Sequence, residues 1–164
     1  MQVRNIWIVA LIVMLAMALS PAAWADEEKY VDAIHYPDNE EGWSRFYDLA
    51  ERLTRDFDAV CGDTFCESDY SNIQSLRLRC SVERATGVMG ECIWTFAGSY
   101  EDVDPVNGRV QVDARVWNCK APLAAGTSIE HFYAALEGSH LMDAIDAPLP
   151  GTKLSLYDGL TDCL

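Results

Sequence analysis

The chain has 164 residues, 50% of them hydrophobic, and a formal net charge of −14, because 26 acidic side chains outnumber 12 basic ones. A protein this acidic repels nucleic acids and anionic lipid headgroups, so we expect no nucleic-acid partner. The charge favours a cationic partner instead, which could be a basic protein, a polyamine or a metal ion, and a basic protein is the expected one. Solubility alone is the alternative explanation of the charge.

The first 25 residues have the pattern of a secretory signal peptide. Arg4 precedes the apolar run IWIVALIVMLAMAL, and the small residues of Ala-Trp-Ala (23–25) come directly before the charged segment DEEK. We expect cleavage after Ala25. An uncleaved membrane anchor is the alternative, although the run is short for a span of about 20 residues. We expect one α+β domain over residues 26–164 and no stable membrane insertion after cleavage, because no second long apolar run follows.

All six cysteines lie after the expected cleavage site, at positions 61, 66, 80, 92, 119 and 163. An even number of cysteines in an exported chain indicates disulfides, because the compartments outside the cytoplasm are oxidising. We therefore expect a periplasmic protein of a bacterium, or a secreted protein.

A first helix is predicted in the segment PDNEEGWSRFYDLAERLTRDFDAVCG, residues 37–62. Asp38 with Glu41 has the spacing of a capping box, and Gly62 is expected to stop the helix. Apolar residues recur at steps of three and four, which predicts one stripe facing the core. The stripe consists of Trp43, Phe46, Ala50, Leu53, Phe57 and Val60.

Three strands are predicted next, in the segments LRLRCSV (76–82), GECIWTFAGSY (90–100) and GRVQVDARVWNC (108–119). Apolar and polar residues alternate in each, as they do in half-buried antiparallel strands. A turn centred on Thr86 would bring six residues to one apolar face. These are the opposed pairs Cys80–Cys92, Leu78–Trp94 and Leu76–Phe96.

The second turn is expected near Val106, where Pro105 and Asn107-Gly108 supply turn residues. A turn centred on Val106 pairs Phe96 with Val116 and Tyr100 with Val112. The disulfides follow from this arrangement. Directly opposed positions favour Cys80–Cys92. Cys61–Cys66 would close a tight ring after the first helix, and Cys119–Cys163 would tie down the C-terminal tail.

A second helix is predicted after residue 126, with a capping box of Thr127 and Glu130 and an expected stop at Gly138. Its apolar stripe is Ile129, Phe132, Tyr133 and Leu136. The segment HLMDAIDA adds a further helical turn, and a short strand is expected at residues 153–157, followed by an Asp158-Gly159 turn.

The predicted fold is therefore α+β: an N-terminal helix and a later helix packed on one face of a three- to four-stranded antiparallel β-meander, stabilised by disulfides. A helix on a meander resembles the cystatin-like roll in outline. The inhibitor motif of that family is missing, so the resemblance implies a shape and no function.

We expect no catalytic residues, no metal site and no cofactor. The sequence has no G-x-S-x-G motif, and six paired cysteines leave no thiol nucleophile. The C-x4-C spacing of Cys61 and Cys66 differs from that of a zinc or thioredoxin-like motif. Asp63, Glu67 and Asp69 carry calcium-type oxygens without the spacing of an EF-hand loop.

Two surfaces are candidates for binding. The first is the loop stapled by Cys61–Cys66, because a rigid loop lowers the ordering cost of binding; its candidate residues are Phe65, Glu67, Asp69 and Tyr70. The second is the non-core face of the meander, where arginine and tryptophan are typical interface anchors; its candidates are Arg77, Arg79, Arg115 and Trp117. Alternatively, the loop only ends the helix, and the arginines only form ion pairs or lie under the C-terminal segment.

The leading functional hypothesis is an exported, non-catalytic binding protein, for example an inhibitor or immunity protein that neutralises a basic cell-wall hydrolase or toxin. A ligand- or calcium-binding envelope protein is the first alternative. A hydrolase that uses carboxylates is the second.

Overall fold

The protein is represented by a computed structural model that describes residues 28–164 except 68, 138–139 and 141. The expected signal peptide and the expected helix stop at Gly138 lie outside the described residues. The elements follow in this order: β1 (Tyr30–Asp32), the short 3-10 helix η1 (Ala33–His35), α2 (Glu40–Cys61), β2 (Gln74–Glu83), β3 (Met89–Val103), β4 (Val110–Lys120), α3 (Ile129–Leu136), α4 (Asp143–Asp146) and α5 (Leu156–Thr161).

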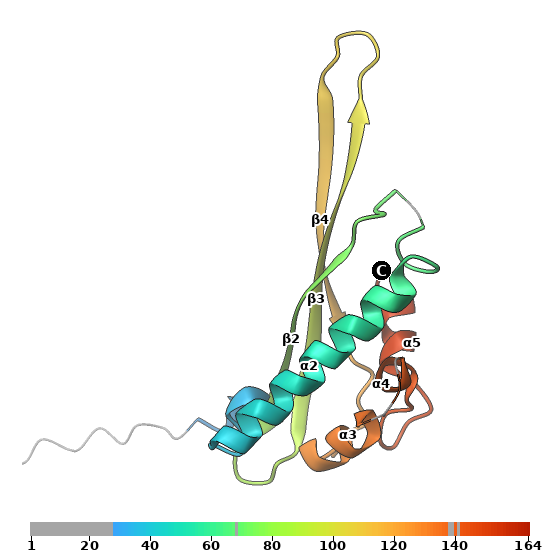
Figure 1. The fold of residues 1–164 in the computed structure, drawn as a ribbon. Coiled ribbons are helices and arrows are strands. Elements are labelled where there is room, and N and C mark those ends of the chain that lie inside the picture. The colour runs from blue at the N-terminus through green and yellow to red at the C-terminus, as the bar shows by residue number, and fades with distance from the viewer. Residues whose placement is uncertain (1–27, 68, 138–139, 141) are drawn as a thin grey trace, which may run out of the picture.

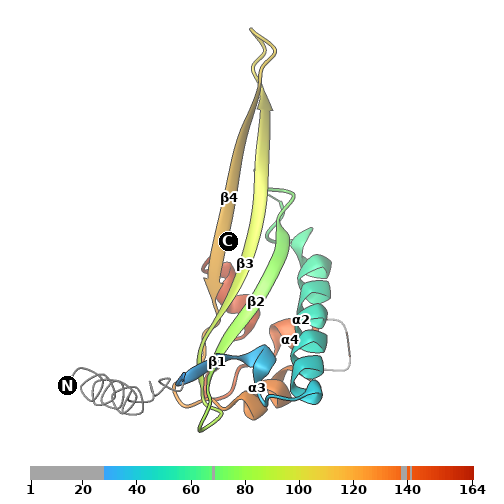
Figure 2. The same ribbon diagram turned by 90° about the vertical axis from the view of Figure 1, so that its left-hand side faces the viewer.

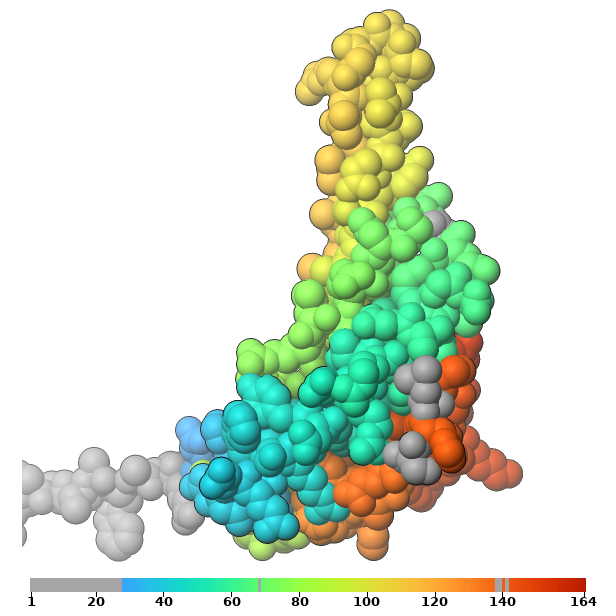
Figure 3. Space-filling view, viewed as in Figure 1, coloured from blue at the N-terminus to red at the C-terminus, as the bar shows by residue number. Residues whose placement is uncertain are grey.

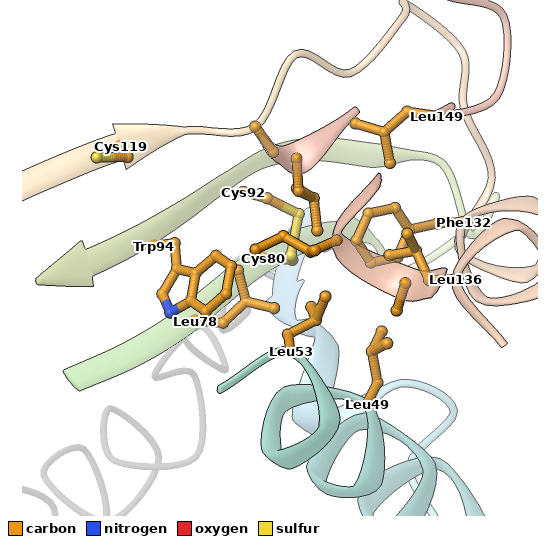
Figure 4. Packing of buried hydrophobic residues seen from close by; sticks show 14 of the residues in the cluster. Leu49, Leu53, Leu78, Cys80, Cys92, Trp94, Cys119, Phe132, Leu136 and Leu149 are labelled. Carbon is orange, nitrogen blue, oxygen red and sulfur yellow. A yellow bond between two sulfur atoms is a disulfide. The ribbon is translucent and has the colours of Figure 1, made fainter. Parts of the chain in front are cut away.

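The four strands form one antiparallel sheet in the order β1-β2-β3-β4, and α2 and the C-terminal helices cover one of its faces (Figures 1 and 2). Phe57 of α2 packs on Trp94 and Phe96 of β3, with ring centroids 6.0 and 4.6 Å apart. Figure 4 shows that leucines of α2 meet β2, β3 and α3 in the same core. The predicted α+β fold is confirmed.

A two-stranded arm projects from this body. β2 pairs with β3 only as far as Gln74–Ala97, whereas the β3–β4 ladder continues without interruption to Val103–Val110. We call residues 98–115 the arm. It extends beyond the helices, and the space-filling view shows it standing clear of the body (Figures 1 and 3).

The first helix differs from the prediction at its N-terminal turn. Asn39, not Asp38, caps α2, because its side chain accepts a hydrogen bond from the Gly42 amide. Trp43 is exposed instead of buried and packs on Tyr47. The core-facing stripe includes Leu49, which the predicted stripe lacked, and turns away from Trp43.

Asp56 is fully buried in α2, where an apolar residue would be the ordinary choice. Its carboxylate accepts hydrogen bonds from the backbone amides of Met142, at 3.0 Å, and Ile145, at 3.3 Å. It therefore holds the start of α4 against α2. The apolar periodicity of the sequence gives no sign of this role.

The β2–β3 register agrees with the prediction at Cys80–Cys92 and Leu78–Trp94, and differs at Leu76. A bulge between Ser75 and Arg77 inserts one extra residue, so Phe96 lies opposite Ser75. Leu76 is pushed out of the apolar face and is 56% exposed. A bulge breaks the strict alternation on which the prediction depended.

The β3–β4 register is one residue away from the predicted one. Phe96 pairs with Trp117, and Tyr100 pairs with Asp113. The cause lies in the turn. The Asp104 amide donates a hydrogen bond to the Arg109 carbonyl, and the Asp104 carboxylate accepts hydrogen bonds from the Val106 and Asn107 amides. The turn is thus centred between Val106 and Asn107 instead of on Val106. A slip of one residue moves every side chain of β4 to the opposite face.

The C-terminal region differs in two places. The strand expected at residues 153–157 is wrong: α5 begins at Leu156, and a capping box of Ser155 and Asp158 starts it. The cap of α3 is Ser128, whose side chain accepts from the His131 amide, and not Thr127. β1, which the sequence pattern did not predict, is the fourth strand of the sheet.

The structure contains the disulfides Cys61–Cys66, Cys80–Cys92 and Cys119–Cys163, the three pairs expected from the sequence. The first closes the end of α2, the second joins β2 to β3, and the third fastens the end of the chain to β4. Three disulfides indicate an oxidising compartment, periplasmic or extracellular.

Candidate functional site

The loop stapled by Cys61–Cys66 lies against the body, and its aromatic candidates, Phe65 and Tyr70, pack against other side chains. Phe65 is half-buried, with its ring 6.0 Å from Phe57 and 5.3 Å from Tyr157. It therefore closes the core beside the Cys61–Cys66 bridge. Of the other predicted loop residues, Glu67 and Asp69 are exposed.

Tyr70 reaches from the loop to β4 at the base of the arm. Its ring meets Trp117 edge-on at 5.3 Å, and the guanidinium of Arg115 lies 4.8 Å from the ring centre. The Tyr70 hydroxyl donates a hydrogen bond to the Asp113 carboxylate. Desolvation, together with this hydrogen bond, raises the pKa of Tyr70 above its usual value. The structure thus brings together three predicted binding residues, Tyr70, Arg115 and Trp117, from the two surfaces that the sequence kept apart.

Arg77 and Arg79 lie on the other face of the sheet, opposite Thr95 and Ile93 of β3. The expected cluster of three arginines and a tryptophan therefore does not form. The one-residue change of register in β4 separates them, because it moves Arg115 and Trp117 to the helix-covered face. Arg79 forms an ion pair with Asp32. Arg77 is exposed, and within the described part of the chain no acidic side chain pairs with it.

The same register change gives the arm and the adjoining Val116 an apolar face that the sequence analysis missed. Val103 pairs with Val110, and Val112 and Val116 follow on the same face of β4. These four valines are between 59% and 64% exposed, and Val106 at the tip is 92% exposed. We call Val103, Val110, Val112 and Val116 the valine face.

A signal for this face was present in the strand lengths. The predicted first strand has seven residues, whereas the following two have eleven and twelve. The longer strands could not be covered by the shorter one along their whole length, so part of their hairpin had to stand alone.

The loop anchors the base of the arm. The Asn72 side chain accepts a hydrogen bond from the Ser99 amide, at 2.7 Å, and donates one to the Ser99 hydroxyl, at 2.9 Å. Gly98 precedes Ser99 in β3, and a Cβ atom at Gly98 would come within 3.4 Å of the side chains of Asn72, Ile73 and Trp117. The close approach of these three side chains therefore favours glycine at this position.

A groove lies between α2 and the edge of β2. This groove has a volume of about 650 Å³. Its lining is mostly apolar and includes Phe46, Tyr47, Ala50, Leu76 and Leu78. Arg77, Arg79 and Glu51 also line it, so the groove combines an apolar floor with charged side chains of both signs.

All six cysteines are in disulfides, and in the described part of the chain no three His, Cys, Asp or Glu side chains gather as metal ligands do. None of the helices within the described ranges is both long enough and apolar enough to cross a bilayer. Comparisons with protein-family models, curated proteins and solved structures gave no match to this chain.

Proposed function

We propose that this protein is an exported, non-catalytic binding protein and that the arm is its recognition element. The observation that carries this proposal is the exposed valine face. Isolated two-stranded hairpins are only marginally stable in water, and exposed apolar patches mark interaction sites. An arm that is anchored at its base and apolar along one face is suited to contact another protein.

The charge distribution favours a basic partner. Acidic side chains gather at the far end of the arm: Glu101 pairs with Val112 on the valine face, Asp102 lies on the opposite face, and Asp104 lies in the turn. The whole chain carries a net charge of −14. An apolar centre with a charged rim is the usual composition of a protein interface, and complementary charge speeds association. A concrete version is a periplasmic or secreted inhibitor or immunity protein that neutralises a basic cell-wall hydrolase or toxin.

The test is capture of a partner from an extracytoplasmic extract of the source organism at low ionic strength. The wild-type chain is compared with a Val103→Thr/Val110→Thr variant, which keeps the shape and strand propensity of the arm while adding two hydroxyls to its apolar face. Burying hydroxyls without partners costs about 1–3 kcal/mol. We expect the wild type to retain a basic protein and the variant to bind the same protein about tenfold more weakly.

The control is Leu154→Thr, which changes an apolar residue with 48% exposure outside the arm. The Leu154→Thr variant should bind the partner as tightly as the wild type does. Added salt should weaken partner binding by the wild type and by both variants. Equal capture by the arm variant, or no basic protein captured at low ionic strength, would count against the proposal.

A small apolar ligand in the α2–β2 groove is the second candidate, favoured by the volume and lining of the groove. The dye 1-anilinonaphthalene-8-sulfonate is a suitable probe, because its sulfonate can pair with Arg77. Ala50→Trp should fill the groove and remove the dye fluorescence, whereas Ala59→Trp, at an exposed position of the same helix, should not. Equal fluorescence from both variants would exclude the groove as the dye site.

A further inference from the structure

β4 is one of the two edge strands of the sheet, and its residues 110–117 have few of the features that usually protect such edges. Natural proteins protect edge strands with charged side chains, especially lysine, with proline, with bulges or by short length. The two charges of this segment, Asp113 and Arg115, are opposite in sign. Residues 110–117 contain no lysine or proline, and the β3–β4 pairing has no shift from Ile93–Lys120 to Val103–Val110. A long, regular and partly apolar free edge is a template for another strand.

The hydrogen-bond pattern shows which backbone groups of β4 are available. The Ala121 amide donates to the Cys92 carbonyl at 3.0 Å, so this pair is of the hydrogen-bonded type. Hydrogen-bonded and non-hydrogen-bonded pairs alternate along an antiparallel ladder. The backbone hydrogen bonds to β3 therefore come from residues 119, 117, 115 and 113. The amides and carbonyls of Val112, Ala114 and Val116 point outward from the sheet.

These outward groups limit how a second β4 strand can pair with the first. In an antiparallel pair of β4 strands, residues with outward backbone groups must lie opposite each other. The two-fold axis can therefore pass through Asp113, Ala114 or Arg115, or through a position nearer one end of the strand. An axis at Asp113 places two Asp113 carboxylates opposite each other, and an axis at Arg115 does the same with two guanidinium groups. Like charges directly opposed across strands are destabilising.

The axis at Ala114 has neither conflict. It pairs Val112 with Val116 of the second copy on one face, and Asp113 with Arg115 of the second copy on the other face. Each of these contacts occurs twice by symmetry. Within one chain Arg115 already lies 3.5 Å from the Asp113 carboxylate, and Tyr70 contacts both side chains on that face. Apolar side chains therefore meet apolar ones, and each charge meets its opposite.

We propose that the chain forms a two-fold symmetric dimer through antiparallel pairing of β4 edges, centred on Ala114. The dimer joins two four-stranded sheets into one, and because the axis is perpendicular to the sheet, both valine faces lie on the same side. The inference stands apart from the proposed function, since it needs only a second copy of this chain.

Sedimentation equilibrium of residues 26–164 in about 0.15 M salt, where the Debye length is about 8 Å and net repulsion is largely screened, tests this directly. The wild type should be a dimer. Asp113→Arg and Arg115→Asp should each raise the dimer dissociation constant at least about tenfold, because each creates two like-charge contacts by symmetry. Circular dichroism of both variants should match the wild type.

Mixing the two single variants provides a test that is specific to the register. An Asp113→Arg chain against an Arg115→Asp chain restores both opposite-charge contacts, so the equimolar mixture should form heterodimers although neither variant associates alone. The double variant Asp113→Arg/Arg115→Asp should also dimerise. A wild type that stays monomeric at high concentration, or a mixture that does not associate, would overturn the proposal.

Ala114→Pro tests the strand edge itself. The Ala114 amide points away from β3, so proline at this position removes an outward donor without removing a bond of the β3–β4 ladder. The variant should fold and be monomeric. Dimerisation as strong as that of the wild type would show that the chain associates by another surface.

Discussion

At the scale of single residues, Tyr133 combines burial with an unpaired polar atom. It is 1% exposed, and its hydroxyl is the buried side-chain atom that finds no hydrogen-bond partner among the described residues. Arg45 lies 4.2 Å above its ring and pairs with Glu130 and Glu137, so α2 and α3 meet around this side chain. Burial raises the pKa of Tyr133 to about 12.

This pKa predicts how stability depends on pH. The unfolded chain loses the phenolic proton near pH 10, its ordinary value, and the folded chain near 12. The folded state disfavours the phenolate, so this group leaves the free energy of unfolding unchanged below pH 10 and lowers it as the pH rises toward 12. Tyr133→Phe should remove this part of the alkaline decline in the free energy of unfolding, measured by urea titration from pH 8 to 11.5.

At pH 7, Tyr133→Phe should be neutral or stabilising by up to about 1 kcal/mol, since it removes a buried hydroxyl without a partner. Tyr47→Phe, on an exposed tyrosine of α2, is the control. An alkaline decline that is the same in wild type and Tyr133→Phe would contradict this account of the site.

At the scale of elements, Asn72 links the loop after α2 to the arm. Asn72→Ala removes both hydrogen bonds to Ser99 and leaves the core untouched. We expect amide hydrogen exchange to accelerate about tenfold in residues 98–103 and 110–115, with exchange in α2 unchanged. Asn107→Ala, within the turn, serves as the comparison. Acceleration spread evenly over the protein would mean that Asn72 acts on global stability instead of on the arm.

The disulfides should differ in their contribution to stability according to the length of chain they enclose. Cys119–Cys163 joins positions 44 apart, and Cys61–Cys66 joins positions five apart. In the chain-entropy description, replacing Cys119 and Cys163 by alanine lowers the free energy of unfolding by about 4 kcal/mol. Replacing Cys61 and Cys66 by alanine lowers it by about 2 kcal/mol. Urea unfolding of the two double variants measures the difference. An equal loss would show that effects in the folded state dominate.

Features that depend on a pattern over many residues were predicted correctly, whereas features that depend on a single turn or cap were not. α2 and the Cys80–Cys92 register follow from periodicity over many residues, and both were found. The register of β4 depends on how Asp104 closes one turn, which shifts the centre by half a residue. α5 starts at a capping box, Ser155 with Asp158, whose spacing is visible in the sequence but was outweighed by the alternation in LSLY.

The candidate site was only partly predictable for the same reason. Tyr70, Arg115 and Trp117 were singled out as candidate binding residues on two separate surfaces, and their meeting depends on the β4 register and on the path of the loop. The valine face depends on the length of β2 relative to β3 and β4, a property of three segments together. Fully buried Asp56 has no counterpart in any sequence pattern.

At the scale of the whole molecule, the proposed function gives the body and the arm separate roles. Three disulfides, the helix layer and the sheet make the body a rigid base. The arm carries an exposed apolar face away from that base (Figures 1 and 3). A rigid support for a projecting contact surface lowers the ordering cost of binding. The central claim is that this arm is where the protein recognises its partner.

The most direct test shortens the arm while keeping the body. Residues 101–112 are replaced by Asn-Gly, which connects the paired residues Tyr100 and Asp113 through a two-residue hairpin turn. The three disulfides and the near-ultraviolet circular dichroism of the body should be unchanged. Partner capture from the extracytoplasmic extract is then measured for the full-length and the shortened arm. We predict that the shortened protein loses the partner that the wild type retains, and capture of the same partner with equal affinity would contradict the claim.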